Sequence, residues 1–172
     1  MKTYRKIVQT LGDRSGFTLV EVLVASMILV VALLTLASMF PMGYKQITDA
    51  GRMTVAVSGA RHILEDVGDI PFNNISNLNG VDTGSNAGVI AGLGGTEAEI
   101  ARRWRYMMAG PGDGFTFTGA ETAAWGTPRT YAGRAVVTVA NTSATLRTVT
   151  VTVTIPGLPT TVTMGTVIVR MF

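Results

Sequence analysis

A single carboxylate interrupts a long apolar run near the start of the chain. Glu21 is the one charged residue between Phe17 and Phe40. An ionised side chain is costly inside a bilayer, and such residues are normally kept for a function and paired with a group that neutralises them. The apolar run itself offers no basic residue. We therefore expect the partner of Glu21 to come from processing of the chain or from its assembly with another subunit.

The other reactive residue types are sparse. The chain has one histidine, His62, and no cysteine, which excludes cysteine nucleophiles, cysteine metal ligands and disulfides. Ser58 and His62 are one helical turn apart, but no third group at a recognisable spacing completes a nucleophile and base arrangement. We predict a protein that is not an enzyme, with no catalytic residues, no metal site and no cofactor.

The apolar run has the length of a membrane span. Its 24 residues, 17–40, would extend about 36 Å as a helix at about 1.5 Å per residue, and the hydrocarbon core of a bilayer is about 30 Å thick. Lys2, Arg5, Lys6 and Arg14 precede it. Because basic residues favour the cytoplasmic side, we expect a cytoplasmic N-terminus and an exported C-terminal part.

The junction before the run differs from an ordinary secretory signal, whose apolar core is only about 7 to 15 residues long. Gly16 directly precedes Phe17, and Glu21 follows four residues later. These residues resemble the type IV prepilin signature, which is shared by pilins, minor pilins and the pseudopilins of type II secretion. The resemblance implies cleavage between Gly16 and Phe17, N-methylation of Phe17 and a role for Glu21 in filament assembly.

Cleavage would supply the missing partner of Glu21. The new amine of Phe17 is positive, and opposite charges attract far more strongly in a low dielectric than in water. A subunit that entered the filament out of register would leave Glu21 buried alone, which is unfavourable by several kcal/mol. We therefore interpret the pairing of the Phe17 amine with Glu21 of a neighbouring subunit as a device that sets the register of assembly.

Removal of the leader also changes the charge balance. The first 16 residues hold four of the 14 basic and one of the 11 acidic residues, so the remaining 156 residues carry ten of each. The mature chain would be neutral, and the basic character of the precursor reflects topology rather than a nucleic-acid footprint. Without cysteine, the chain also departs from the many Gram-negative major pilins that close a C-terminal loop with a disulfide.

The chain divides into a cleaved leader (1–16), a transmembrane and assembly helix (17–40), an exported continuation of that helix (41–68) and a globular head (69–172). Pro41 predicts a kink or pause at residues 40–43, because proline removes a helical donor and clashes with the preceding turn. Helical spacing predicts that the exported part buries one apolar stripe against the head. The residues of this stripe are Met53, Val57, Ala60, Leu64 and Val67.

Residues 72–95 are rich in asparagine and glycine. Segments of this length without regular structure tend to be functional or mobile, so we predict a loop that contacts other subunits. Oxygen ligands from Asn and Asp side chains also leave calcium binding open, although the spacing of an EF-hand is missing.

Residues 96–108 predict a short helix. Thr96 and Glu99 have the spacing of a capping box, and Ile100, Trp104 and Met108 follow at helical intervals. The helix carries a basic cluster of Arg102, Arg103 and Arg105. We expect a solvated helix face, with contact to nucleic-acid phosphates as the functional alternative.

The last third of the chain is the clearest β pattern. Three valines and Ile155 alternate with threonines from residue 148 to 155, which indicates a strand with one buried and one wet face. Pro156 and Gly157 suit the centre of a type II turn. Strands at 134–139 and 160–171 complete a meander, with a bulge at Gly165 where the apolar parity switches. The expected fold is α+β, a long N-terminal membrane-spanning helix packed on a small antiparallel sheet.

The sequence therefore predicts a structural subunit of a type IV pilus or type II secretion filament, either a minor pilin or a pseudopilin. The alternative is a pilin that displays its head to DNA or a surface. The resemblance implies other pilin subunits, a prepilin peptidase and methyltransferase, an inner-membrane assembly platform and membrane lipid as partners. It also implies a single-pass inner-membrane protein that passes into a periplasmic or cell-surface filament.

Overall fold

The computed structural model describes residues 16–85 and 88–170. The chain forms two compact units that meet after Gln46, and each is described by itself. Apart from Gly16, the predicted leader lies outside the described residues, as does the predicted strand end at Met171.

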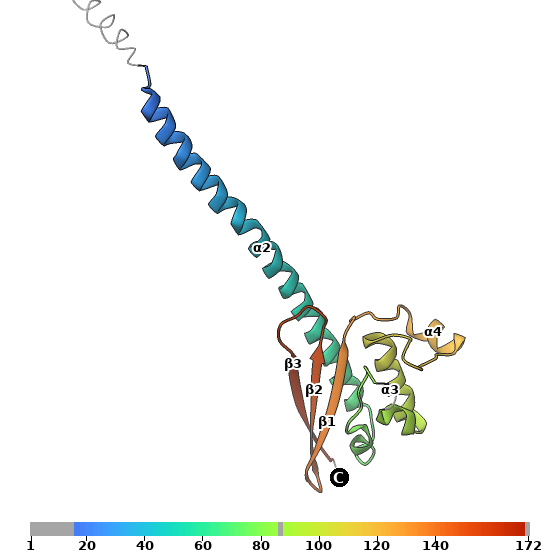
Figure 1. The fold of residues 1–172 in the computed structure, drawn as a ribbon. Coiled ribbons are helices and arrows are strands. Elements are labelled where there is room, and N and C mark those ends of the chain that lie inside the picture. The colour runs from blue at the N-terminus through green and yellow to red at the C-terminus, as the bar shows by residue number, and fades with distance from the viewer. Residues whose placement is uncertain (1–15, 86–87, 171–172) are drawn as a thin grey trace, which may run out of the picture. The chain divides into compact units, whose positions relative to one another are not determined.

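One helix, α2 (Leu19–Gly68), contributes to both units (Figure 1). It is helical without interruption through Pro41, so the predicted pause at residues 40–43 is wrong. Proline removes one backbone donor, and the neighbouring turns keep their own hydrogen bonds. Gly68 ends the helix, and Pro71 follows three residues later.

The buried face of α2 lies one position away from the predicted stripe. Ala60 and Val67 are in the core as expected, whereas Met53 is 44% exposed. Val57 and Leu64 only border the core. The buried line of α2 consists of Ala56, Ala60, Ile63 and Val67. Small and polar residues obscured this phase, because Gly59 and Asp66 are also buried and do not enter an apolar pattern.

The segment after α2 is more structured than the predicted loop. It contains two 3-10 turns, η1 (Ile75–Leu78) and η2 (Val89–Gly92). Its apolar side chains enter the core, namely Ile75, Leu78, Val81 and Ile90. Residues 80–83 also exchange backbone hydrogen bonds with residues 135–137. The glycines and asparagines thus shape turns around a core-forming segment.

Two helices follow, α3 (Gly95–Met108) and α4 (Gly119–Trp125). The end of α3 at Met108 is as predicted, but the helix begins before Thr96, and Gly94 stands at its N-cap without a side-chain bond. The capping box lies instead at α4, where Thr118 and Glu121 satisfy each other's backbone N–H groups. The sequence reasoning missed α4, although the same Thr-x-x-Glu spacing marks it.

The sheet has the predicted meander topology, with strands β1 (Arg134–Ser143), β2 (Leu146–Thr154) and β3 (Val162–Val169) in the order β1-β2-β3. Pairing is antiparallel throughout. The register of β2 with β3 is continuous past Gly165, so the bulge predicted there is wrong, and the irregularity lies at residues 141–143 of β1. The apolar parity switches because Val167 and Val169 are simply exposed.

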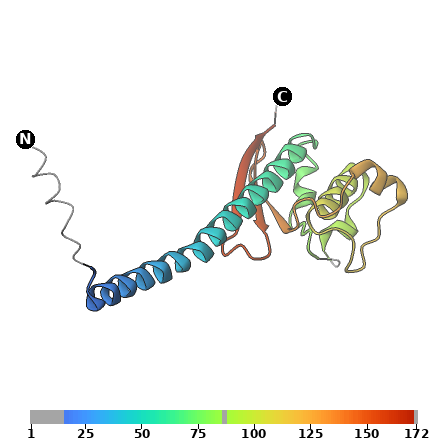
Figure 2. The ribbon, with the colours of Figure 1, turned by 90° about the horizontal axis from the view of Figure 1, so that it is seen from above.

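The core of the head joins α2, the 70–90 segment, α3 and the sheet in one cluster. The alternation in β2 is confirmed, since Val149, Val151 and Val153 are fully buried. Gly157 has a φ of 81° in the turn after β2, as the centre of a type II turn requires. In both views β3 and α4 lie at opposite ends of the head (Figures 1 and 2). The α+β prediction is confirmed.

Candidate processing and assembly site

The N-terminal end of α2 has a defined cap. Residues 16–18 are not helical, and the helix begins at Leu19. The hydroxyl oxygen of Thr18 accepts a hydrogen bond from the backbone N–H of Glu21 at 3.2 Å, and its carbonyl accepts one from Val22 at 3.2 Å. A residue that bonds in this way occupies the N-cap position. Gly16 and Phe17 therefore lie just outside the helix, and Glu21 lies in its first turn.

The remaining polar groups of the apolar run are satisfied within the helix. The hydroxyl groups of Ser26, Thr35 and Ser38 each donate to a carbonyl three or four residues earlier. No residue from 16 to 46 is buried. Among the described residues, no basic side chain forms an ion pair with Glu21. Within the apolar run, residues 17–40, its carboxylate is thus the one charge, and it is left to an outside partner.

Within the described part of the chain, α2 is the helix long and apolar enough to cross a membrane. Its apolar side chains are exposed along the whole predicted span; Phe17 and Leu19 are each 78% exposed. Such a surface is stable only when lipid or other apolar helices cover it.

The three arginines of α3 do not form a common patch. Arg102 binds Glu121 of α4 at 2.8 Å, and Arg103 binds Asp66 of α2 at 2.5 Å. Arg105 is 1% exposed and donates to the carbonyls of Thr83 and Gly112. The expected solvated helix face is therefore wrong for Arg105, whereas the side chains of Arg102 and Arg103 are 31% and 34% exposed. Each guanidinium group binds an acceptor in a different segment of the head.

Two ion pairs of the head, Arg102 with Glu121 and Arg134 with Asp82, lower the pKa of the acidic partner. The Arg102 guanidinium lowers the pKa of the Glu121 carboxyl to about 2, and hydrogen bonding from Arg134 lowers the pKa of Asp82 below its ordinary value. In both cases the cationic donor stabilises the charged form. Burial raises the pKa of Tyr131, with Asp66 and Glu65 adding to the effect.

Asp66 is a central residue that the sequence reasoning missed. It lies on the buried side of α2, and its two carboxylate oxygens accept from Arg103 and from the indole N–H of Trp104 at 2.7 Å. His62 approaches the same carboxylate at 3.7 Å. An acidic residue on the apolar face of a predicted helix is the signal that could have identified Asp66, because a buried acid needs a partner.

Two of the oxygen-bearing side chains that left calcium binding open in residues 72–95 form hydrogen bonds within the head. Asp82 binds Arg134 and the backbone N–H of Gly84, and the side-chain oxygen of Asn79 accepts from the N–H of Val139 at 2.9 Å. In the described residues, no group of three or more His, Cys, Asp or Glu side chains is placed to hold a metal ion.

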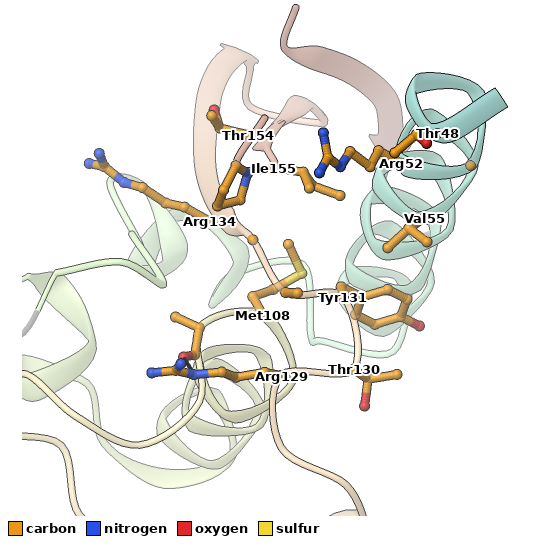
Figure 3. A pocket seen from close by; sticks show the side chains of 15 residues that line it. Thr48, Arg52, Val55, Met108, Arg129, Thr130, Tyr131, Arg134, Thr154 and Ile155 are labelled. Carbon is orange, nitrogen blue, oxygen red and sulfur yellow. Dashed lines mark hydrogen bonds between the residues drawn. The ribbon is translucent and has the colours of Figure 1, made fainter. Parts of the chain in front are cut away.

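A groove of about 870 Å³ lies in the head between α2, residues 129–134 and the turn after β2 (Figure 3). Three arginines line it. Arg52 donates to the carbonyl of Gly157, Arg129 to that of Ala109, and Arg134 to Asp82. The guanidinium groups of Arg129 and Arg134 point away from α2 (Figure 3). They do not converge on a common ligand position.

A family model of the prokaryotic N-terminal methylation motif matches residues 12–37. No curated protein and no solved structure matches the chain. The motif is the signature of the type IV pilin family, whose members are structural proteins, and it implies assembly with other pilin subunits and processing by a prepilin peptidase. The matched residues include Gly16, Phe17 and Glu21, and they enter the apolar helix of an α+β fold with a pilin-like layout. The chain therefore carries the N-terminal signature of type IV pilin-like and pseudopilin precursors, followed by an apolar helix of the kind that anchors a protein in a membrane.

Proposed function

We propose that this protein is a minor pilin or pseudopilin, inserted in the inner membrane as a prepilin with a cytoplasmic N-terminus and an exported head. Its leader is cut between Gly16 and Phe17, Phe17 is N-methylated, and the subunit enters a periplasmic or cell-surface filament. The observation that carries the proposal is the coincidence of the methylation motif with a non-helical Gly16–Phe17 junction directly before the apolar helix.

Assembly rests on Glu21. Its carboxylate has no ion-pair partner in the described chain, and cleavage creates an amine at Phe17 that a neighbouring subunit can offer. Two such groups attract strongly once lipid and helices exclude water. An inner-membrane assembly platform would bring the subunits together.

The branch of the family follows from three features of the sequence. The leader before Phe17 is long, residues 104–114 form a segment with Trp, Pro and Gly, and the last strands are rich in threonine and valine. These features resemble minor pilins and pseudopilins more than major fibre subunits.

Mass spectrometry of the protein extracted from membranes tests the proposal. The expected mature chain begins with methylated Phe17 and lacks the first 16 residues. As a control, Gly16→Leu replaces the residue before the cut with a bulky one, and this variant should keep its leader. A wild-type mature chain that still contains Arg14 would contradict the proposal.

The alternative function is a binding module that displays the head to DNA or a surface. The arginines on which it depended, Arg102, Arg103 and Arg105, each have an acceptor inside the head, so nothing in their arrangement favours it. Retention of DNA on the exported part, residues 44–172, at 150 mM salt would revive this alternative. We expect only weak, salt-sensitive DNA binding, at the same level for residues 44–172 of the wild type and for the variant Lys45→Gln.

A further inference from the structure

We propose that Thr18 is a positioning residue for removal of the leader. Its hydroxyl group fixes the start of α2 at Leu19 and thereby keeps the Gly16–Phe17 bond in backbone that a peptidase can bind. The inference rests on the proposed cleavage after Gly16.

The structure places Thr18 at the N-cap. Its side-chain oxygen accepts from the N–H of Glu21, and residues 16–18 stand outside the helix. The sequence around it carries the two further marks of a helix start. Glu21 is at the third helical position, as in a capping box, and the apolar pair Phe17 and Val22 has the spacing of a hydrophobic staple. The residues of the methylation motif are thus also the residues that begin the helix.

The position of this boundary matters for cleavage. A peptide bond inside a helix has its N–H and C=O groups engaged in the helical ladder, so it cannot pair with the active site of a peptidase. The bilayer favours helix extension, because each unpaired backbone group is costly in lipid. A cap directly after Phe17 opposes that extension and leaves the bond to be cut outside the helix, with Phe17 and Thr18 between it and Leu19.

The size of the effect follows from the strength of an N-cap. Replacing a capping Thr with a non-capping residue shifts the balance between correct and incorrect helix starts by about fivefold. We expect a similar loss in the rate of leader removal. Asn and Ser are at least as good as Thr at the N-cap, whereas Val is poor, so the order of the variants is fixed in advance.

The experiment follows leader removal from the full-length precursor in membranes that contain the prepilin peptidase. Pulse-labelled wild type is compared with Thr18→Val, Thr18→Ser and Thr18→Asn. Thr35→Val is the matched control, because the Thr35 hydroxyl also bonds within α2 but in the middle of the span. Mass spectrometry identifies the cut in each product.

We expect Thr18→Val to be processed about fivefold more slowly, and Thr18→Ser, Thr18→Asn and Thr35→Val at nearly the wild-type rate. Rescue by Asn separates a cap from direct recognition of the hydroxyl, since an amide caps a helix but is not a hydroxyl. Equal rates for Thr18→Val and wild type, or an Asn variant as slow as the Val variant, would overturn the inference while the proposed function stands. A wild-type precursor that is never cut after Gly16 would overturn both.

Discussion

Two carboxylates on the same helix, Glu21 and Asp66, differ in their surroundings: one has binding partners within the chain and the other has none among the described residues. Asp66 lies in the head, where Arg103 and Trp104 of α3 bind its two oxygens. Glu21 lies in the described N-terminal region, residues 16–46, where nothing is buried and no basic side chain pairs with it. The head therefore supplies the partners of Asp66, whereas the N-terminal region leaves Glu21 to an outside partner.

The same difference holds for apolar surface. The head buries its aliphatic side chains in one cluster, while the apolar side chains of residues 17–40 are exposed. A folded domain and an interaction element thus share one helix. Changes in the head should alter stability, and changes in the N-terminal region should alter assembly.

The sharpest test of this division is Glu21→Val. We expect more than a tenfold loss of protein from the filament fraction, because the variant lacks the charge that meets the Phe17 amine of a neighbour. Membrane insertion should persist, since replacing a charge with an apolar residue eases it, and so should leader removal, since the backbone bond to Thr18 remains. Cells making only the variant are sheared, and membrane and filament fractions are compared. Wild-type incorporation would show that Glu21 does not set the register.

Val151→Asp should have the largest effect on the head. Val151 is fully buried in β2, so the variant buries an unpaired charge and should lower the free energy of unfolding by about 3 to 5 kcal/mol. Thr152→Asp places the same charge on the other face of the strand and should cost less than about 1 kcal/mol. Urea denaturation of residues 44–172 measures both. Equal losses would mean that the faces of β2 are wrongly assigned.

Asp66→Ala should have the next largest effect. It leaves Arg103 and the indole of Trp104 without their acceptor, and removing one member of a buried ion pair typically lowers the free energy of unfolding by about 3 kcal/mol. Glu65→Ala, at the exposed neighbouring position, is the matched control and should stay within about 0.5 kcal/mol. Similar values for the two variants would show that the Asp66 cluster does not stabilise the head.

The smallest expected effect is a dependence on pH. The pKa of Glu121 lies at about 2 in the folded head, against an ordinary value of 4.5. A lowered carboxyl pKa contributes stability that is fully present above the ordinary value and is lost as the pH falls towards the folded value. Glu121→Gln should therefore flatten the fall of the denaturation midpoint between pH 4.5 and 2. Arg102→Gln should flatten it to a smaller degree, because the hydrogen bonds from Thr118 to Glu121 also lower this pKa and remain. An unchanged profile in either variant would contradict the pairing.

The amount that sequence could reveal differed between the two regions. Patterns among residues a few positions apart were enough to predict three features. These are the apolar span, the Gly16–Phe17 junction and the alternation in β2. The Thr-x-x-Glu spacing was less reliable. It occurs at Thr18, Thr96 and Thr118, and the structure has a threonine cap at the first and third positions but not at the second.

Predictions from local pattern were wrong where a segment distant in sequence determined the structure. Residues 72–95 have the composition of a loop, yet their backbone pairs with β1 about 50 residues later, as in the bond from Thr83 to Ala135. The apolar stripe of α2 was placed one position off, because the buried side includes small and polar residues that give no apolar signal. One of them is Gly59, where an added Cβ would lie 3.2 Å from the sulfur of Met108 in α3.

By itself the sequence determined the membrane helix, the processing signature and the strands of the meander, because hydropathy and periodicity act over one or two turns of chain. Only the tertiary structure decided which groups the charged side chains bind. Arg102, Arg103 and Arg105 are adjacent in the chain, but their partners lie 19, 37 and 22 residues away. A charge is stabilised by whichever acceptor the fold brings within hydrogen-bonding distance, and that acceptor is set by packing rather than by neighbours in sequence.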